Sequence, residues 1–147
     1  MSTTYRVHNP YNGDLLGEYS YADWPRIDQA LATLQQGERT QRGIPAHARA
    51  GILRELANLL EQHSEELAAL ITAETGKTIS DARVELVRAI NTTIASGEEA
   101  RQISGEALDS DAYAPTRGRL GVVCWRPLGT VLCITPFNFP VNIAMHK

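Results

Sequence analysis

The stretch that decides the fold is Thr130–Pro140, which reads TVLCITPFNFP. Its first five residues, 130–134, form a short, continuous apolar run, which is typical of a strand buried on both faces in a parallel α/β sheet. Pro136 and Pro140 interrupt the hydrogen bonding that the strand would need to continue. Pro140 is also well placed as the first residue of a helix. The stretch therefore predicts a strand, a turn and a helix start, as at the βα junction of a dinucleotide-binding fold.

Asn138 lies in this turn, between two phenylalanines and two prolines. Ligands of open α/β sheets bind beyond the carboxyl ends of the strands, where Asn138 would lie. Its side-chain amide can donate a hydrogen bond to an oxyanion that develops during a reaction. The alternative interpretation is that Asn138 only caps the helix that begins near Pro140. Spacing alone leaves both interpretations open.

The N-terminal part, residues 1–22, is predicted to form a β-hairpin around Asn12-Gly13. Asn-Gly favours a type I′ turn because both residues tolerate a positive φ. Asp23 is expected to cap a short helix that reaches about Gln36.

Residues 46–102 carry the periodicity of three helices. Gly76 is expected to end the second helix, with Lys77 beside its last carbonyls. The third helix, capped by Thr78 or Ser80, would end near residue 102. Residues three or four apart predict the apolar faces of the first and third helices: Ile52, Leu53, Leu56, Leu59 and Leu60, and Val84, Val87, Ile90 and Ile94.

Residues 104–126 lose the helical period and contain turn-like clusters, which predicts an extended, protruding segment without a core of its own. Gly121–Arg126 has the composition of a strand. An ordinary long surface hairpin is the alternative.

Composition limits the class of protein. The chain has 147 residues, of which 43% are hydrophobic, and this suits one globular domain. The net charge is −3 without a basic block, so a nucleic-acid role has no electrostatic support. Neither a secretory signal nor an apolar run of ~18 residues is found, so we expect no membrane association and a cytoplasmic location. Cys124 and Cys133 lie in apolar stretches away from histidines, which predicts buried, reduced thiols and no metal site.

Three motifs resemble those of the aldehyde dehydrogenase superfamily, in the family's own order. The specific one is Pro127-Leu128-Gly129 followed by the Pro-Phe-Asn-Phe-Pro turn. Asn9-Pro10 is similar to the family's opening, and Glu74–Lys77 to its Glu-Thr-Gly-Lys helix end. The resemblance covers nearly the whole chain, which we identify as an N-terminal fragment of an NAD(P)-dependent member.

The resemblance implies an α/β fold: the helix-rich N-terminal part of a Rossmann-type cofactor domain, with an extended β arm. Residues 1–103 would form the hairpin and the helical part, and residues 104–126 an oligomerisation arm. Residues 127–147 would supply the first strand, turn and helix of the dinucleotide-binding core, cut short at its end. The full-length protein is expected to be a homodimer or homotetramer.

The resemblance also implies a chemistry. In the family a cysteine thiolate attacks the aldehyde, NAD or NADP takes the hydride, and water releases the carboxylic acid. Asn138 matches the amide that stabilises the thiohemiacetal oxyanion, and Lys147 matches a lysine of a possible proton relay. The cofactor-bordering positions are matched by Ile134, Thr135, Pro136 and Phe137, and those that line the substrate tunnel by Phe139, Asn142, Ile143 and His146.

Spacing alone also places the four tunnel positions on one helical face. Asn142 and His146 are polar, which favours a small or polar aldehyde. The alternative for His146 is a solvated histidine or one satisfied within the core.

Other residues that the family uses have no match here. The two cysteines lie upstream of the turn and match no nucleophile, and neither a general-base glutamate nor a GxGxxG turn occurs. A buried parallel strand needs neighbours on both sides, so we expect the isolated chain to be poorly packed and prone to aggregation. Two alternative functions stay open: a CoA-acylating semialdehyde dehydrogenase, and a non-catalytic, truncated interaction module.

Overall fold

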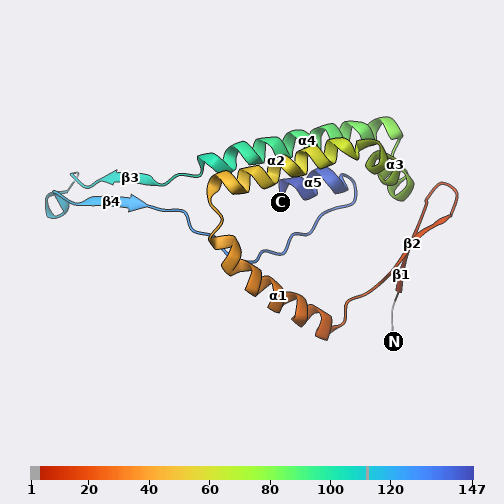
Figure 1. Cartoon of the computed structure of the whole chain (residues 1–147), viewed down its shortest axis with the longest axis horizontal. Helices are drawn as coiled ribbons and strands as arrows, with labels where there is room; N and C mark the ends of the chain where they lie inside the picture. Colours follow the sequence, from red (N-terminus) through yellow and green to blue (C-terminus); the bar gives the residue numbers. More distant parts are fainter. Residues whose placement is uncertain (1–3, 112) are drawn as a thin grey trace.

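The computed structural model describes residues 4–111 and 113–147. Figure 1 shows an elongated molecule in which helices α2 (Ala46–Gln62) and α4 (Ile79–Gln102) lie side by side. The shorter helices α3 (Ser64–Thr75) and α5 (Pro140–His146) pack against α4. The other described elements are helix α1 (Trp24–Arg42), strands β1 (Thr4–His8), β2 (Leu15–Ser20), β3 (Glu106–Asp109) and β4 (Leu120–Val123), and the 3-10 turn η1 (Ala114–Thr116).

The first hairpin pairs β1 with β2 in antiparallel fashion, as predicted. In its turn only Gly13 has a positive φ, of 79°, so the prediction of a type I′ turn was wrong. The loop is longer than two residues: the N–H of Asn9 bonds the Asp14 carbonyl, and the N–H of Gly13 bonds the Asn9 carbonyl. Such a loop needs only one left-handed residue. The first three residues of the predicted hairpin lie outside the described part of the chain.

Helix α1 begins where it was predicted but ends later. Asp23 accepts a hydrogen bond at 3.0 Å from the backbone N–H three residues on, which confirms the predicted N-cap. The helix then continues to Arg42 instead of ending near Gln36. Gly37 lowers helix propensity, yet it keeps its backbone hydrogen-bonding groups, so the first strong break comes only with Pro45.

The boundary between α3 and α4 follows local signals. Gly76 ends α3 in a left-handed conformation, with φ 74°, as predicted. Thr78, rather than Ser80, caps α4 by accepting a hydrogen bond from the Asp81 N–H. A side chain at Gly76 would also crowd Pro10, since its Cβ would lie 3.1 Å from the Pro10 Cγ. The loop of the first hairpin therefore rests on the end of α3.

Small side chains form most of the buried face of α4. Ala82, Ala89 and Gly97 are buried there; Ala82 packs in a cluster with buried residues of α3, and Gly97 lies against α2. A Cβ on Gly97 would lie 3.5 Å from the Ala50 carbonyl oxygen of α2. Close packing of this kind selects the smallest residues at the helix contact.

The predicted apolar faces were therefore only partly right. Leu60 is buried as expected. Because the contact selects alanine and glycine, several larger side chains of the predicted faces are exposed instead: Ile52 and Leu59 of α2, and Val84, Val87 and Ile94 of α4.

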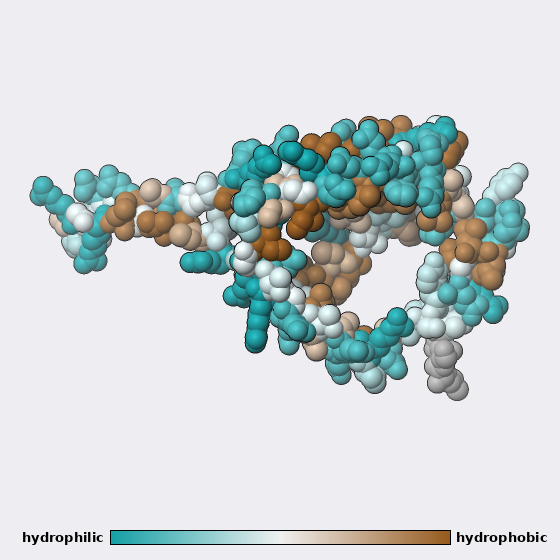
Figure 2. All heavy atoms as spheres, viewed as in Figure 1, coloured by the Kyte–Doolittle hydropathy of each residue, from teal (hydrophilic) through white to brown (hydrophobic). Residues whose placement is uncertain are grey.

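The second hairpin pairs β3 with β4 and projects from the helical body (Figure 1). All four residues of β3 are exposed. Figure 2 shows hydrophobic residues at the surface of this hairpin. Strand β4 ends at Val123, three residues before the end predicted for the strand Gly121–Arg126. Residue 112 lies outside the described part.

The strand predicted for residues 130–134 is absent from the described structure. Leu132 is 85% exposed, and no described strand pairs with this segment. A strand exists through its hydrogen bonds to a neighbour, and an apolar run cannot supply these alone. Cys124 and Cys133 are exposed free thiols, so the prediction that they are buried was wrong. Cys133 lies in this unpaired segment, and Cys124 directly follows strand β4 of the projecting hairpin. Helix α5 nevertheless begins at Pro140, as predicted.

Two further observations apply to the residues that the structure describes. No helix among them is both long and apolar enough to cross a lipid bilayer. No three of their His, Cys, Asp or Glu side chains come together as a metal-ion site would require.

We predict that Gly76→Ala destabilises the protein that carries this chain by about 1 kcal/mol or more, because alanine is strained at a positive φ. The matched control is Gly51→Ala in α2, where a new Cβ meets nothing within 4 Å. That control should stabilise the protein by roughly 0.5–1 kcal/mol, since alanine favours the helix interior. Urea unfolding measures both changes, and a stabilising Gly76→Ala would contradict the prediction.

Candidate functional site

The turn before α5 is held by a carboxylate from another helix. The first N–H groups of a helix lack partners within it. Here the backbone N–H groups of Val141 and Asn142 donate to Oε1 of Glu85 in α4, at 2.9 and 3.2 Å. Phe139 is the N-cap residue and makes no side-chain capping bond. The interpretation that Asn138 caps this helix is therefore wrong, because Glu85 takes that role across 56 residues of sequence.

Lys77 completes this arrangement. Its Nζ lies 2.5 Å from Oε2 of Glu85, and the two side chains are 15% and 0% exposed. The same Nζ donates to the backbone carbonyl of Asn138 at 2.6 Å and lies 4.1 Å from the centre of the Phe139 ring. Lys77 was predicted to lie beside the last carbonyls of α3, and this was wrong. A buried carboxylate needs a cation far more than exposed helix carbonyls do.

Asn138 thus has a fixed backbone and a free side chain. Its carbonyl is held by Lys77, whereas its amide makes no hydrogen bond to the residues that the structure describes. The residue is exposed. An amide with unused N–H donors on a restrained turn is what stabilisation of an oxyanion requires.

The four positions predicted for the substrate tunnel differ in their burial and in their contacts with α4. Phe139 and Asn142 face α4: the ring of Phe139 lies 5.4 Å from the Arg88 guanidinium, and the side-chain oxygen of Asn142 accepts a hydrogen bond from Thr92 at 3.2 Å. Asn142 is buried, Ile143 is half-buried and His146 is exposed. The structure therefore joins two of the four positions with Arg88 and Thr92.

The positions predicted to border the cofactor, Ile134–Phe137, form an exposed segment directly before the turn. Ile134 and Phe137 are 76% and 81% exposed. Lys147, predicted for a proton relay, is exposed and lies directly after α5.

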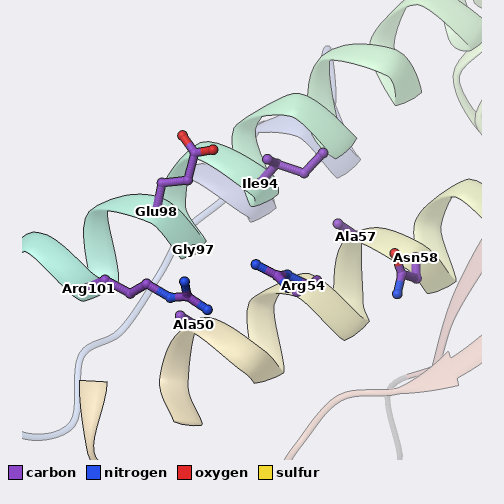
Figure 3. A pocket seen from close by; sticks show the side chains of 8 residues that line it. All are labelled: Ala50, Arg54, Ala57, Asn58, Ile94, Gly97, Glu98 and Arg101. Carbon is purple, nitrogen blue, oxygen red and sulfur yellow. The ribbon is translucent and has the colours of Figure 1, made fainter. Parts of the chain in front are cut away.

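A separate groove lies between α2 and α4 (Figure 3). It follows the stretch of α4 from Ile94 to Arg101 and contains none of the predicted site residues. Arg54, Asn58, Glu98 and Arg101 provide its polar lining, and small residues leave room for it. The groove therefore does not belong to the turn that carries Asn138.

Sequence reasoning missed Glu85 and Arg88. The sequence predicts that Glu65, Glu66, Glu98 and Glu99 lie on solvated helix faces, and all four are exposed. Glu85, however, lies three residues after Ala82 and four before Ala89, within the stripe of small residues that α4 buries. An acid in such a stripe is a signal that could have been found, because buried acids need partners.

The chain is similar to known proteins over its whole length. The family model described as "Aldehyde dehydrogenase family" matches residues 1–147. A sulfoacetaldehyde dehydrogenase of Neptuniibacter caesariensis is 62% identical over 147 residues, which are 100% of this chain and 32% of the relative. An aspartate-semialdehyde dehydrogenase of Pseudomonas canavaninivorans is 36% identical over 96% of this chain and 30% of its own length.

The fold of the chain also matches solved structures of aldehyde dehydrogenases. Aldehyde dehydrogenase 21 from Physcomitrella patens, crystallised with the reaction product succinate, matches 99% of this chain and 30% of its own with a TM-score of 0.94 and 32% identity. This confirms the predicted helix-rich α/β fold of an aldehyde dehydrogenase cofactor domain. The chain spans about a third of the length of these relatives. Since the family model covers every residue, the chain belongs to the aldehyde dehydrogenase family.

Proposed function

We propose that the protein carrying this chain oxidises a short, anionic aldehyde to the carboxylic acid with NAD or NADP. The observation that carries the proposal is the turn at Asn138, whose backbone is restrained while its side-chain amide stays free. This amide donates a hydrogen bond to the aldehyde oxygen as a thiolate adds to the carbonyl carbon and negative charge grows on that oxygen. The nucleophilic cysteine belongs to a part of the protein outside this chain.

The exposed segment before the turn fits a nicotinamide cofactor. Ile134 and Phe137 expose apolar side chains in the four residues before Asn138, and an apolar surface suits the face of a planar ring. When bound, NAD(P)+ supplies the hydride acceptor. The contribution of this chain is to border the cofactor and to hold the aldehyde oxygen at the amide of Asn138.

Two independent observations support a substrate that carries a negative charge. The substrates named for the two relatives carry a sulfonate or a carboxylate, and the product bound to aldehyde dehydrogenase 21 is a dicarboxylate. In this chain Arg88 lies beside Phe139, and among the described residues no carboxylate forms an ion pair with it. A guanidinium that is not neutralised at a site edge suits a sulfonate or carboxylate.

The β3–β4 hairpin is the element that we propose for self-association into a homodimer or homotetramer. Its outer edges have no partner strand within the described part of the chain, and it exposes Leu108, Leu120 and Val122. Exposed apolar edge strands are generally covered by another segment or chain.

We predict that Asn138→Ala lowers kcat for aldehyde oxidation by about 10²–10³-fold, the loss expected when one oxyanion donor is removed. The control is Asn58→Ala in α2, an exposed asparagine that lines the separate groove. It should leave kcat unchanged. Steady-state kinetics of the intact enzyme decides, and a kcat for Asn138→Ala within a few-fold of the parent would refute the assigned role.

A second prediction concerns the charge of the substrate. Arg88→Met should raise KM for sulfoacetaldehyde by about 10-fold or more, because a charge-assisted contact is lost. KM for propionaldehyde, which carries no anionic group, should change little. Arg101→Met, on the same helix but in the groove, is the control. Equal losses for the charged and the uncharged aldehyde would argue against Arg88 as the anion contact.

A further inference from the structure

A buried ion pair accounts for how the turn is held. Glu85 is fully buried, which is unfavourable for a carboxylate unless every acceptor position is matched. Its Oε1 accepts from two backbone N–H groups of α5, and its Oε2 accepts from Lys77. A serine or aspartate at the N-cap would satisfy the helix at lower cost, yet position 139 is a phenylalanine. Unlike a local cap, the buried charge of Glu85 ties the start of α5 to another helix, α4.

The ion pair forms hydrogen bonds on both sides of the start of α5. Lys77 donates to the carbonyl of Asn138, before the helix, and Glu85 accepts from the N–H of Val141, after its start. The two ends of the turn are thus tied to one ion pair on the α3–α4 boundary. Lys77 also lies against the ring of Phe139, which restrains the residue next to Asn138.

We propose that Lys77 and Glu85 are positioning residues, which fix the backbone of Asn138 so that its amide meets the reacting oxygen. The inference rests on the proposed function of Asn138. The side chain of Asn138 has no hydrogen bond of its own to the described residues, so its placement depends on its backbone. Misplacement of a catalytic group by 1 Å can cost about 10²-fold in rate. Lys77 and Glu85 act on the rate through Asn138 and do not touch the substrate.

The test is a double-mutant cycle in the intact enzyme. Lys77→Met should lower kcat by roughly 10- to 100-fold with little change in KM for the aldehyde. In an Asn138→Ala background the same substitution should lower kcat by less than about threefold, because the group that Lys77 positions is already gone. A purely structural lysine would lower kcat by the same factor in both backgrounds. Glu85→Gln keeps the shape of the side chain, and it replaces Lys77→Met in the cycle if that variant does not fold.

The control is the ion pair between Arg83 of α4 and Glu65 of α3, which is exposed to solvent. Hydrogen bonds from Arg83 hold the pKa of Glu65 below its ordinary value, so the pair is formed at neutral pH. Arg83→Met should leave kcat unchanged. A kcat of Lys77→Met equal to that of this control, or losses that multiply with Asn138→Ala, would overturn the positioning role. Full activity of Asn138→Ala itself would instead overturn the proposed function, and the positioning role with it.

Discussion

Glu85 places a negative charge on the buried face of α4. The groups around the carboxylate bind it through hydrogen bonds and an opposite charge. A buried carboxylate is tolerated only with hydrogen-bond donors on its lone pairs and a cation nearby. The donors are the first turn of α5 and the ammonium group of Lys77. Because these donors come from segments on both sides of the β3–β4 hairpin in the sequence, one charge fixes how the end of α3, the first third of α4 and the start of α5 lie together.

The three motifs that are far apart in the sequence meet at this point. Pro10, from the first hairpin, packs on Gly76 at the end of α3. Lys77, the next residue, bonds the carbonyl of Asn138 in the turn. The left-handed conformation of Gly76 turns the chain sharply, and the very next side chain reaches the turn. The Glu-Thr-Gly-Lys helix end is thus part of the structure that supports the site.

Helix starts and ends could be predicted from nearby residues, because they depend on local backbone geometry. Asp23 as a cap, Gly76 as a helix end and Pro140 as a helix start could be predicted because each depends on its own backbone geometry. Features that depend on distant partners could not. The apolar run at 130–134 has no described neighbour with which to form a sheet, and the burial of Glu85 depends on a helix 56 residues later. The exposure of Val84 and Val87 follows from how closely α2 approaches α4.

Helix α4 connects two parts of the molecule that are otherwise remote. It begins one residue after Thr78, beside the ion pair, and ends at Gln102, where the chain leaves for the β3–β4 hairpin. Its 24 residues contain no proline and span about 36 Å as one uninterrupted rod. Because the helix contains no proline, every residue keeps the backbone N–H that an unkinked helix needs, and its length sets how far the hairpin at its end stands from the ion pair at its start.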